Sequence, residues 1–280
     1  MGTTPPGLPQ VAGWRAARRL PTVWAMDVPG ISRPVLVVLI VVAVLLFAYG
    51  GTKAIALVTE HTDTHTRIVA AAPTIVVGVE TGDVRITGSD RADVRLTTKE
   101  KRSAWGGGHV EVSGDGARLH LGDRCDKVPV VDAPCSVSYV LEVPRNTAVR
   151  VVAGTGDLHA ENLAGGADLR SGTGDLHVEG VRGALHLRAD TGDVHVEAPA
   201  PEASVATGTG DVDIVASQAR SLSVQTGTGD INIVVPDTTY AVDVQSDSGD
   251  DHVGVHRDDA SPRRLKAHTG TGDVHVEPGV

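Results

Sequence analysis

The stretch Thr207-Gly208-Thr209-Gly210-Asp211 recurs unchanged at residues 226–230 and at residues 269–273. Its shorter form Thr-Gly-Asp begins at Thr81, Thr155, Thr173 and Thr191, and Ser-Gly-Asp begins at Ser113 and Ser248. A phrase copied this often is either a ligand site repeated along the chain or the corner of a structural repeat. The residues around each copy favour the corner.

The aspartates of this phrase are regularly spaced in the C-terminal half. Consecutive aspartates are 18 residues apart from Asp157 to Asp211, and the later steps lengthen to 19, 20 and 23 residues. A nearly fixed period of this size is typical of repeat architectures.

Apolar and polar residues alternate on both sides of each aspartate. After Asp211, Val212 and Ile214 enclose a polar residue, and before Asp230, Leu222 and Val224 enclose another. Strict alternation predicts a half-buried strand on each side of the corner. Each unit therefore consists of a strand, a glycine corner, a second strand and a looser corner.

One such unit cannot bury its apolar edge alone, but stacked units place equivalent positions in continuous ladders. Aromatic residues make up only 2 % of the chain, and it contains 33 glycines. Both values fit a narrow interior filled by Val, Leu, Ile and Ala. We therefore predict an all-β fold, a parallel β-solenoid with coils of about 18–20 residues. An antiparallel meander or sandwich fits less well, because equivalent positions would not stack.

The corner phrase then has a structural explanation. Glycine before each aspartate supplies a positive φ or a close backbone approach, and the Asp or Thr side chain accepts a backbone N–H. We expect a structural row of corner aspartates: Asp83, Asp157, Asp175, Asp193, Asp211, Asp230, Asp250 and Asp273. Calcium is the alternative, since Gly-rich, Asp-bearing repeats bind it in RTX proteins. The phrase recurs too rarely for that motif, so no cofactor is expected.

Histidines occupy the polar position after several corners. His159, His177, His195 and His275 stand two residues after their aspartates, so the first three form a row if the coils stack in register. Imidazole rows can bind Zn²⁺ or Cu²⁺. Asp213 and the residue equivalent to it in the next coil interrupt the row, which favours a solvent-facing polar row. No metal site is predicted.

The first part of the repeat region is irregular. Asp83 has the corner pattern, but the next regular corner aspartate is Asp157. Between them, the apolar alternation of residues 110–112 and 118–121 flanks Ser-Gly-Asp-Gly-Ala, which indicates a hairpin or an irregular coil. We expect residues 71–148 to cap the solenoid and residues 149–280 to form its regular repeats.

An apolar segment precedes the repeats. Residues 35–48 contain no polar side chain, and residues 34–51 are long enough for one transmembrane helix. Four arginines precede it, Arg15, Arg18, Arg19 and Arg33. They predict a cytoplasmic tail of residues 1–33 and an exported chain from residue 52. Membrane lipid is the expected partner of the helix. The proline-rich tail is expected to be disordered, and residues 52–70 to form a polar stalk. The expected localisation is the cell membrane, single pass. A cleaved signal peptide is the alternative, with Met26 as a second candidate start.

The chain has two cysteines, Cys125 and Cys135. In an exported domain this spacing indicates a local disulfide. Redox chemistry is the less favoured interpretation.

Charge and motif content disfavour two function classes. The chain has 25 Lys+Arg against 35 Asp+Glu, a formal net charge of −10, whereas nucleic-acid binders show a basic face. Neither a nucleophile elbow nor a distinct pair of carboxylates indicates an enzyme. A carbohydrate-active solenoid enzyme remains the alternative function.

Three features occur in order: the apolar segment, the cysteine pair followed by SYVLEVP at residues 138–144, and serial Thr-Gly-Asp coils. In this order the chain resembles the actinobacterial "putative adhesin" family of unknown function, of the toastrack type, over about residues 71–280. The resemblance implies a single-stranded β-helix and an adhesion, binding or envelope-stress-sensing module without catalytic residues. An envelope protein or polysaccharide is the partner it implies.

Overall fold

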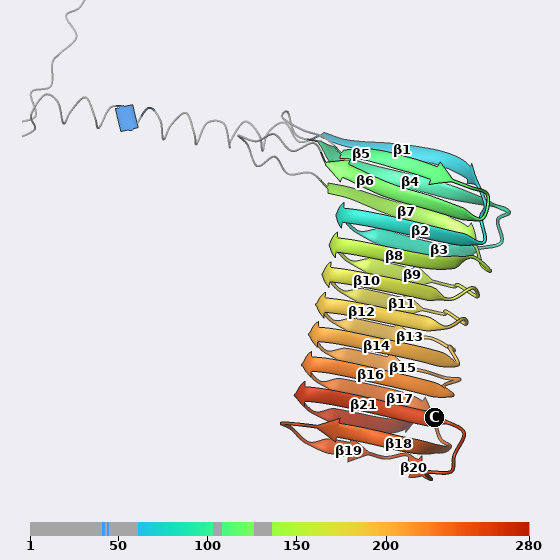
Figure 1. Ribbon diagram of the computed structural model, residues 1–280, viewed down its shortest axis with the longest axis vertical. Coiled ribbons are helices and arrows are strands. Elements are labelled where there is room, and N and C mark those ends of the chain that lie inside the picture. The colour runs from blue at the N-terminus through green and yellow to red at the C-terminus, as the bar shows by residue number, and fades with distance from the viewer. Residues whose placement is uncertain (1–40, 43, 45–60, 103–107, 126–135, 280) are drawn as a thin grey trace, which may run out of the picture. The chain divides into compact units, whose positions relative to one another are not determined.

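The computed structural model describes residues 41, 42, 44, 61–102, 108–125 and 136–279 (Figure 1). The predicted tail 1–33 lies outside these residues, and of the predicted membrane helix only Val41, Val42 and Val44 are described, all helical. No helix in the described ranges is long and apolar enough to cross a membrane. The β strands all belong to one compact unit, Thr52–Val280.

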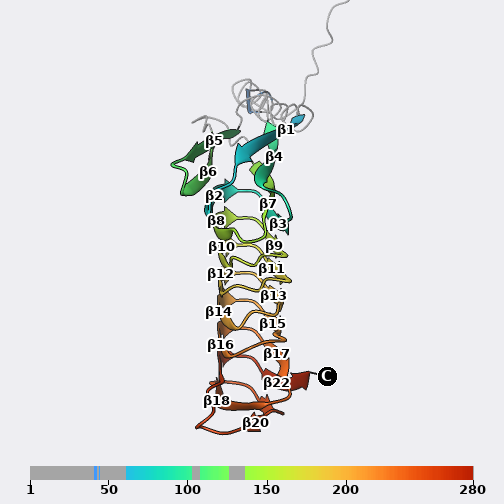
Figure 2. The ribbon, with the colours of Figure 1, turned by 90° about the vertical axis from the view of Figure 1, so that its right-hand side faces the viewer.

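Two 11-stranded sheets make up the described part of this unit, and Figure 2 shows them as two facing stacks of strands. In spatial order, sheet A contains β1 (His61–Ala70), β4 (Asp93–Arg102), β7 (Ser136–Pro144), β3 (Val84–Ser89), β9 (Leu158–Glu161), β11 (Leu176–Glu179), β13 (Val194–Glu197), β15 (Val212–Val215), β17 (Ile231–Pro236), β22 (Val274–Gly279) and β19 (Asp251–Val253). Sheet B contains β20 (His256–Arg257), β18 (Thr239–Ser246), β21 (Arg264–Thr271), β16 (Ser221–Thr228), β14 (Glu202–Thr209), β12 (Leu185–Thr191), β10 (Ala167–Thr173), β8 (Ala148–Thr155), β2 (Thr74–Thr81), β6 (Arg118–Cys125) and β5 (Gly108–Gly114).

Each regular coil contributes one strand to each sheet, and equivalent positions pair in register. Leu176, for example, pairs with Leu158 on one side and with Val194 on the other, both in parallel strands. The regular repeats therefore form the nearly all-β, parallel-stranded arrangement that the 18-residue period predicts.

The interior consists of ladders of aliphatic side chains. Val224 is 1 % exposed, while Ser223 and Gln225 on either side of it face solvent. Burying one such side chain stabilises the fold by about 1.5–3 kcal/mol. The rung neighbours of Val224 are Val205 and Ala267. From the sequence, with coils stacked in chain order, Val224 is expected between Val205 and Val244; the Val244 part of this expectation is wrong, because Ala267 occupies that place.

The last coil in the sequence is not the last coil in the stack. Strand β21 lies between β16 and β18 (Figure 1). In the other sheet β22 lies between β17 and β19. The coil of β18 and β19 thus closes the end of the solenoid. Its Asp251 stands in the column of Ile231 and Val274, which are buried. At the end of the stack this carboxylate is exposed, whereas an interior coil would bury it at a cost of several kcal/mol.

Chain order and spatial order also differ at the other end. On one side, strands β2 and β3 pair with β8 and β9. On their other side they pair with β6 and β7, which lie between β3 and β8 in the sequence. Antiparallel pairs then close this end, β4 with β7, β1 with β4, and β5 with β6.

The structure differs from the expected stalk. Residues His61–Ala70 form strand β1, all ten paired with β4; Thr and Ile alternate with polar residues there, a composition suited to strands. The Ser-Gly-Asp phrase at Ser113 forms the turn of the β5–β6 hairpin, the first of the two alternatives that the sequence left open. The Asp115 carboxylate accepts the N–H groups of Ala117 at 3.0 Å and Arg118 at 2.7 Å, and these bonds lower the pKa of Asp115.

Candidate functional site

Three of the five residues in the repeated phrase Thr207–Asp211 have distinct structural roles. The buried Thr207 hydroxyl donates to the carbonyl oxygen of Gly192 in the preceding coil, at 3.2 Å. Gly210 has φ of 145°, and a Cβ there would overlap that same carbonyl oxygen. The Asp211 carboxylate accepts the backbone N–H of Asp230 in the next coil at 2.9 Å.

This last bond is repeated along the whole row of corner aspartates. In each step the Oδ1 atom of one aspartate accepts the N–H of the aspartate in the adjacent coil, at 2.8–3.2 Å; the spatial order is Asp83, Asp157, Asp175, Asp193, Asp211, Asp230, Asp273 and Asp250. The backbone N–H of each corner aspartate is therefore bonded to a carboxylate of the adjacent coil and not to a group of its own corner. At the glycine corner these side chains accept the N–H groups that backbone carbonyl oxygens accept elsewhere in the sheet.

The geometry gives these carboxylates a structural partner without a cation. Each of these carboxylates, from Asp83 to Asp273 along the stack, has a charge-assisted hydrogen bond to a backbone N–H of the adjacent coil. In the described ranges of the chain, no group of three or more His, Cys, Asp or Glu side chains could hold a metal ion.

The histidine row lies on the outer face of sheet A. The rings of His177 and His195 stack with centroids 5.0 Å apart and an interplanar angle of 12°, and those of His159 and His177 lie 5.6 Å apart. Burial lowers the pKa of His159, with smaller contributions from Arg85 and His177. A lowered pKa favours the neutral imidazole, which can stack without charge repulsion.

His275 lies apart from these three. Asp213 and Asn232, joined by a 2.9 Å hydrogen bond, stand between it and His195. Its neighbour in the stack is His252 of the terminal coil, with ring centroids 6.1 Å apart. His252 was absent from the predicted row because its coil departs from the repeat. The side chains of Cys125 and Cys135 lie outside the described residues.

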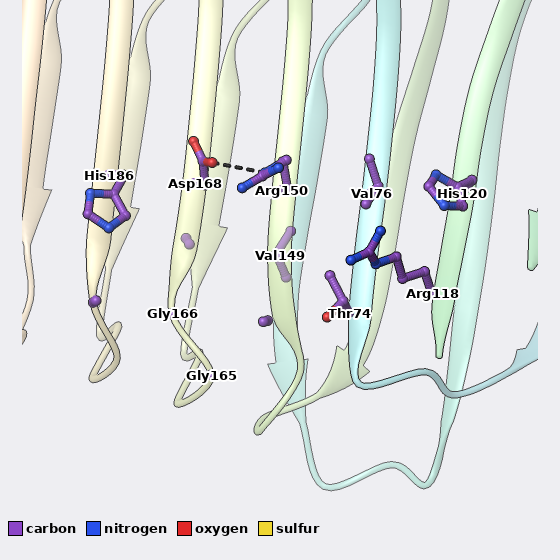
Figure 3. Close-up of a pocket in the computed structure, with 13 residues that line it drawn as sticks. Thr74, Val76, Arg118, His120, Val149, Arg150, Gly165, Gly166, Asp168 and His186 are labelled. Carbon is purple, nitrogen blue, oxygen red and sulfur yellow. Dashed lines mark hydrogen bonds and ion pairs between the residues drawn. The ribbon is translucent and has the colours of Figure 1, made fainter. Parts of the chain in front are cut away.

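A hollow of about 460 Å³ lies on the outer face of sheet B, over strands of the irregular region and of the first regular repeats (Figure 3). Its central row contains one outward side chain from each of five adjacent strands, in the order His120, Val76, Arg150, Asp168 and His186. Four strand steps give this row a length of about 19 Å. The hollow therefore runs along the stack, across the strands.

Charged groups line this hollow over a floor of small residues. Arg150 donates to the Asp168 carboxylate at 2.9 Å, and Arg170 donates to its other oxygen at 3.2 Å. The Asp168 side chain is only 15 % exposed. Arg118 extends toward Thr74 and Val76 (Figure 3). Among the lining residues, Ala148, Ala167, Ala184 and two glycines leave the space open.

The lining of the hollow offers groups that can bind a ligand. Its arginines and histidines offer hydrogen-bond donors beside an aliphatic floor. Asp168 is the one carboxylate in the lining, and both of its oxygens are engaged by arginines. Glycoside hydrolysis ordinarily requires two carboxyl groups facing each other across the substrate.

Sequence reasoning found the outward positions of this hollow but not the hollow itself. Arg150, Asp168 and His186 all occupy the polar position inside the strand before the corner, so their side-by-side placement follows from the period. His120 and Val76 come from the irregular region, and only the actual stacking order brings them beside Arg150.

Residues 140–277 match the protein family described as Toastrack DUF4097. This match supports a toastrack-type domain of unknown function and is consistent with a non-catalytic one. No curated protein matches the chain.

Several solved structures have a similar fold. One is described as a "putative lipid binding protein" from Parabacteroides distasonis, with 11 % identity and a TM-score of 0.49, covering 78 % of this chain and 97 % of that one. A "putative adhesin" from Bacteroides fragilis has 17 % identity, a TM-score of 0.43 and the same coverages. A "putative cell adhesion protein" from Clostridium sporogenes has 11 % identity and a TM-score of 0.41, covering 78 % and 100 %. Similarity at this level carries no information on ligand or function.

Proposed function

We propose that this chain is a membrane-anchored, exported, non-catalytic β-solenoid that binds an elongated polymer of the cell envelope, with a polysaccharide as the first candidate. The observation that carries the proposal is the hollow on sheet B. Five outward side chains there, from His120 to His186, form one row along the stack. A linear ligand lying across the strands would contact each of them in turn.

The chemistry of the hollow supports a sugar chain. Arginine forms paired hydrogen bonds with acidic groups of a ligand, histidine donates to hydroxyl groups, and the aliphatic floor contacts the faces of sugar rings. Val76 and Ala148 supply part of that floor. Binding, adhesion and envelope-stress sensing all require such contact with an envelope component, and none requires catalysis.

Anchoring and export form the second part of the proposal. They rest on the apolar residues 34–51 and on the arginines that precede them. Protease added to intact, wall-stripped cells should remove Thr52–Val280 and leave residues 1–33 protected. Protection of the C-terminal unit would refute this topology. Export would also allow Cys125 and Cys135 to form a disulfide, which peptide mass spectrometry without reductant would detect.

The binding proposal is tested with the full-length protein in detergent micelles and a purified envelope polysaccharide fraction, by calorimetry. Arg118→Ala and His186→Ala should each weaken binding severalfold. Lys266→Ala is the matched control, since Lys266 lies on the same outer face, in β21, and pairs with Asp243 at 3.2 Å. Equal effects of all three substitutions, or no binding by the unaltered protein, would contradict the assignment of the hollow.

A further inference from the structure

A second hollow, of about 510 Å³, lies at the edge of the solenoid where the looser corners stack. It shares no lining residue with the hollow on sheet B. Three arginines line it, Arg182 from the turn before β12, Arg220 from the turn before β16, and Arg263 from the segment before β21. Prolines from the intervening turns complete much of its wall.

Backbone hydrogen bonds fix the spacing of these turns. The N–H of Arg220 donates to the carbonyl oxygen of Pro201 at 2.8 Å, and the N–H of Arg264 donates to the carbonyl oxygen of Arg220 at 2.8 Å. The turns therefore continue the spacing of the strands, about 4.8 Å per step. Strands β12, β14, β16 and β21 are consecutive in sheet B, so the three arginines span three steps, about 14 Å.

The charge of this hollow is not compensated by its lining. No carboxylate lines it; Asp237, between Pro236 and Thr238, does not contribute. Arg182 and Arg220 are exposed and form no ion pair within the part of the chain that the structure describes. Arg263 is half-buried, and its Nη1 donates to the carbonyl oxygen of Ala219 at 2.9 Å, which holds its guanidinium at the hollow.

We propose that this arginine hollow binds a linear anionic polymer that carries phosphate groups. Guanidinium groups form paired, charge-assisted hydrogen bonds with phosphate oxygens. Three of them in a column suit a ligand whose charges are arranged in a line. The prolines keep the turns between them rigid, so little backbone order has to be gained on binding.

A polymer fits this edge better than a membrane surface does. Peripheral membrane binding combines basic residues with apolar side chains that enter the interface. The exposed large hydrophobic residues of the described chain are Val41, Val42, Val44, Ile68, Val152 and Val215, and none lines this hollow.

The test uses the full-length protein in detergent micelles and short linear polyphosphate as the probe, with affinity measured by calorimetry at several salt concentrations. Three engaged arginines predict that the logarithm of the affinity falls against the logarithm of salt with a slope of about −2. Arg220→Gln should weaken binding about tenfold, as expected for one lost charge-assisted contact. Arg182→Gln should act in the same direction, and both variants should keep the unaltered melting temperature.

Arg188→Gln is the control with the same change in net charge. Arg188 lies on β12 at the outer face of sheet B, 3.5 Å from Asp190, and does not line the hollow. Its substitution should change the affinity less than twofold. Equal losses in Arg220→Gln and Arg188→Gln would reduce the effect to net charge and overturn the proposal.

Two further measurements distinguish other occupants. Cosedimentation with phosphatidylglycerol vesicles that is lost in Arg220→Gln, without polyphosphate binding, would reassign the hollow to a lipid surface. Salt-sensitive dimerisation lost in the same variant would reassign it to the acidic face of a second copy. Failure of polysaccharide binding at the sheet B hollow would leave the polyphosphate result unaffected, because the two sites share no residue.

Discussion

Replacing Asp211 by alanine and by asparagine separates two roles that its carboxylate has in the corner row. The carboxylate accepts the N–H of Asp230 at 2.9 Å, and it also carries a negative charge beside its neighbours in the row. Alanine removes both the acceptor and the charge. Asparagine removes the charge but keeps an oxygen at the acceptor position.

The two effects have opposite signs. Adjacent strands are about 4.8 Å apart, so two carboxylates at that distance repel by about 0.9 kcal/mol in water, and by roughly half of that at physiological salt. With Asp193 on one side and Asp230 on the other, removal of the Asp211 charge relieves about 1 kcal/mol. Loss of a hydrogen bond to a charged group costs about 1.5–3 kcal/mol. Asp211→Ala should therefore destabilise by about 1 kcal/mol, and Asp211→Asn should stay within about 0.5 kcal/mol of the unaltered protein.

Thermal unfolding of the full-length chain, followed by far-UV circular dichroism at a fixed heating rate, measures the difference. A change of 1 kcal/mol moves the melting temperature by about 2–4 °C for a domain of this size. Added chelator at constant ionic strength is the control and should leave all three proteins unchanged. If asparagine is as harmful as alanine, and chelator lowers the melting temperature of the unaltered protein alone, the acceptor role is refuted and a bound cation replaces it.

Three other outcomes follow from the same geometry. Gly210→Ala should prevent or severely impair folding, because its φ is 145° and a Cβ would overlap the carbonyl oxygen of Gly192. Gly208→Ala should be milder, although its Cβ would also lie close to a backbone carbonyl oxygen, because Gly208 has no positive φ and other coils hold acidic residues at its position; soluble yield and melting temperature compare the two. Val224→Asp should cost several kcal/mol and Gln225→Asp little, so equal melting temperatures would show that the inward register is wrong. Because the pKa of His159 is lowered, its contribution to stability is present above the ordinary histidine pKa and is lost as the pH falls below that value. His159→Asn should therefore flatten the dependence of the urea midpoint on pH over that acidic range. An unchanged dependence would contradict this.

The coil and its corner could be predicted because their signals are local and repeated. The inward positions around Asp211 and Asp230 alternate with polar ones in the sequence, and the same alternation recurs at each period. Any stack that keeps the coils in register buries Val224 and exposes Gln225. The sequence predicts that the corner aspartate accepts a backbone N–H. It does not predict whether that N–H belongs to the same corner or to the next coil.

The order of the coils could not be predicted in the same way. Parallel strands pair equally well with any coil that has the same pattern, and the longer connection required costs little, since loop-closure entropy grows slowly with length. One residue nevertheless carried the relevant signal. Asp251 stands where every regular coil has an aliphatic side chain, so its coil is suited only to the end of the stack.

The outward positions of the coils are where this fold can acquire a function. In one outward column of sheet B the residues are Arg150, Asp168, His186 and Ser204, although the adjacent inward columns remain aliphatic. The outward residues do not fill the core and do not form the corner, so their charge can change without a loss of packing. In sheet A the outward residues of three coils are instead nearly the same: the segments 155–161, 173–179 and 191–197 have the form Thr-Gly-Asp-apolar-His-apolar-Glu, with no Lys or Arg. Because each outward position is repeated at one strand spacing, the outward side chains stand in rows along the stack, and a linear ligand can contact several members of one row. This correspondence is the physical reason to test both hollows with linear polymers before small molecules.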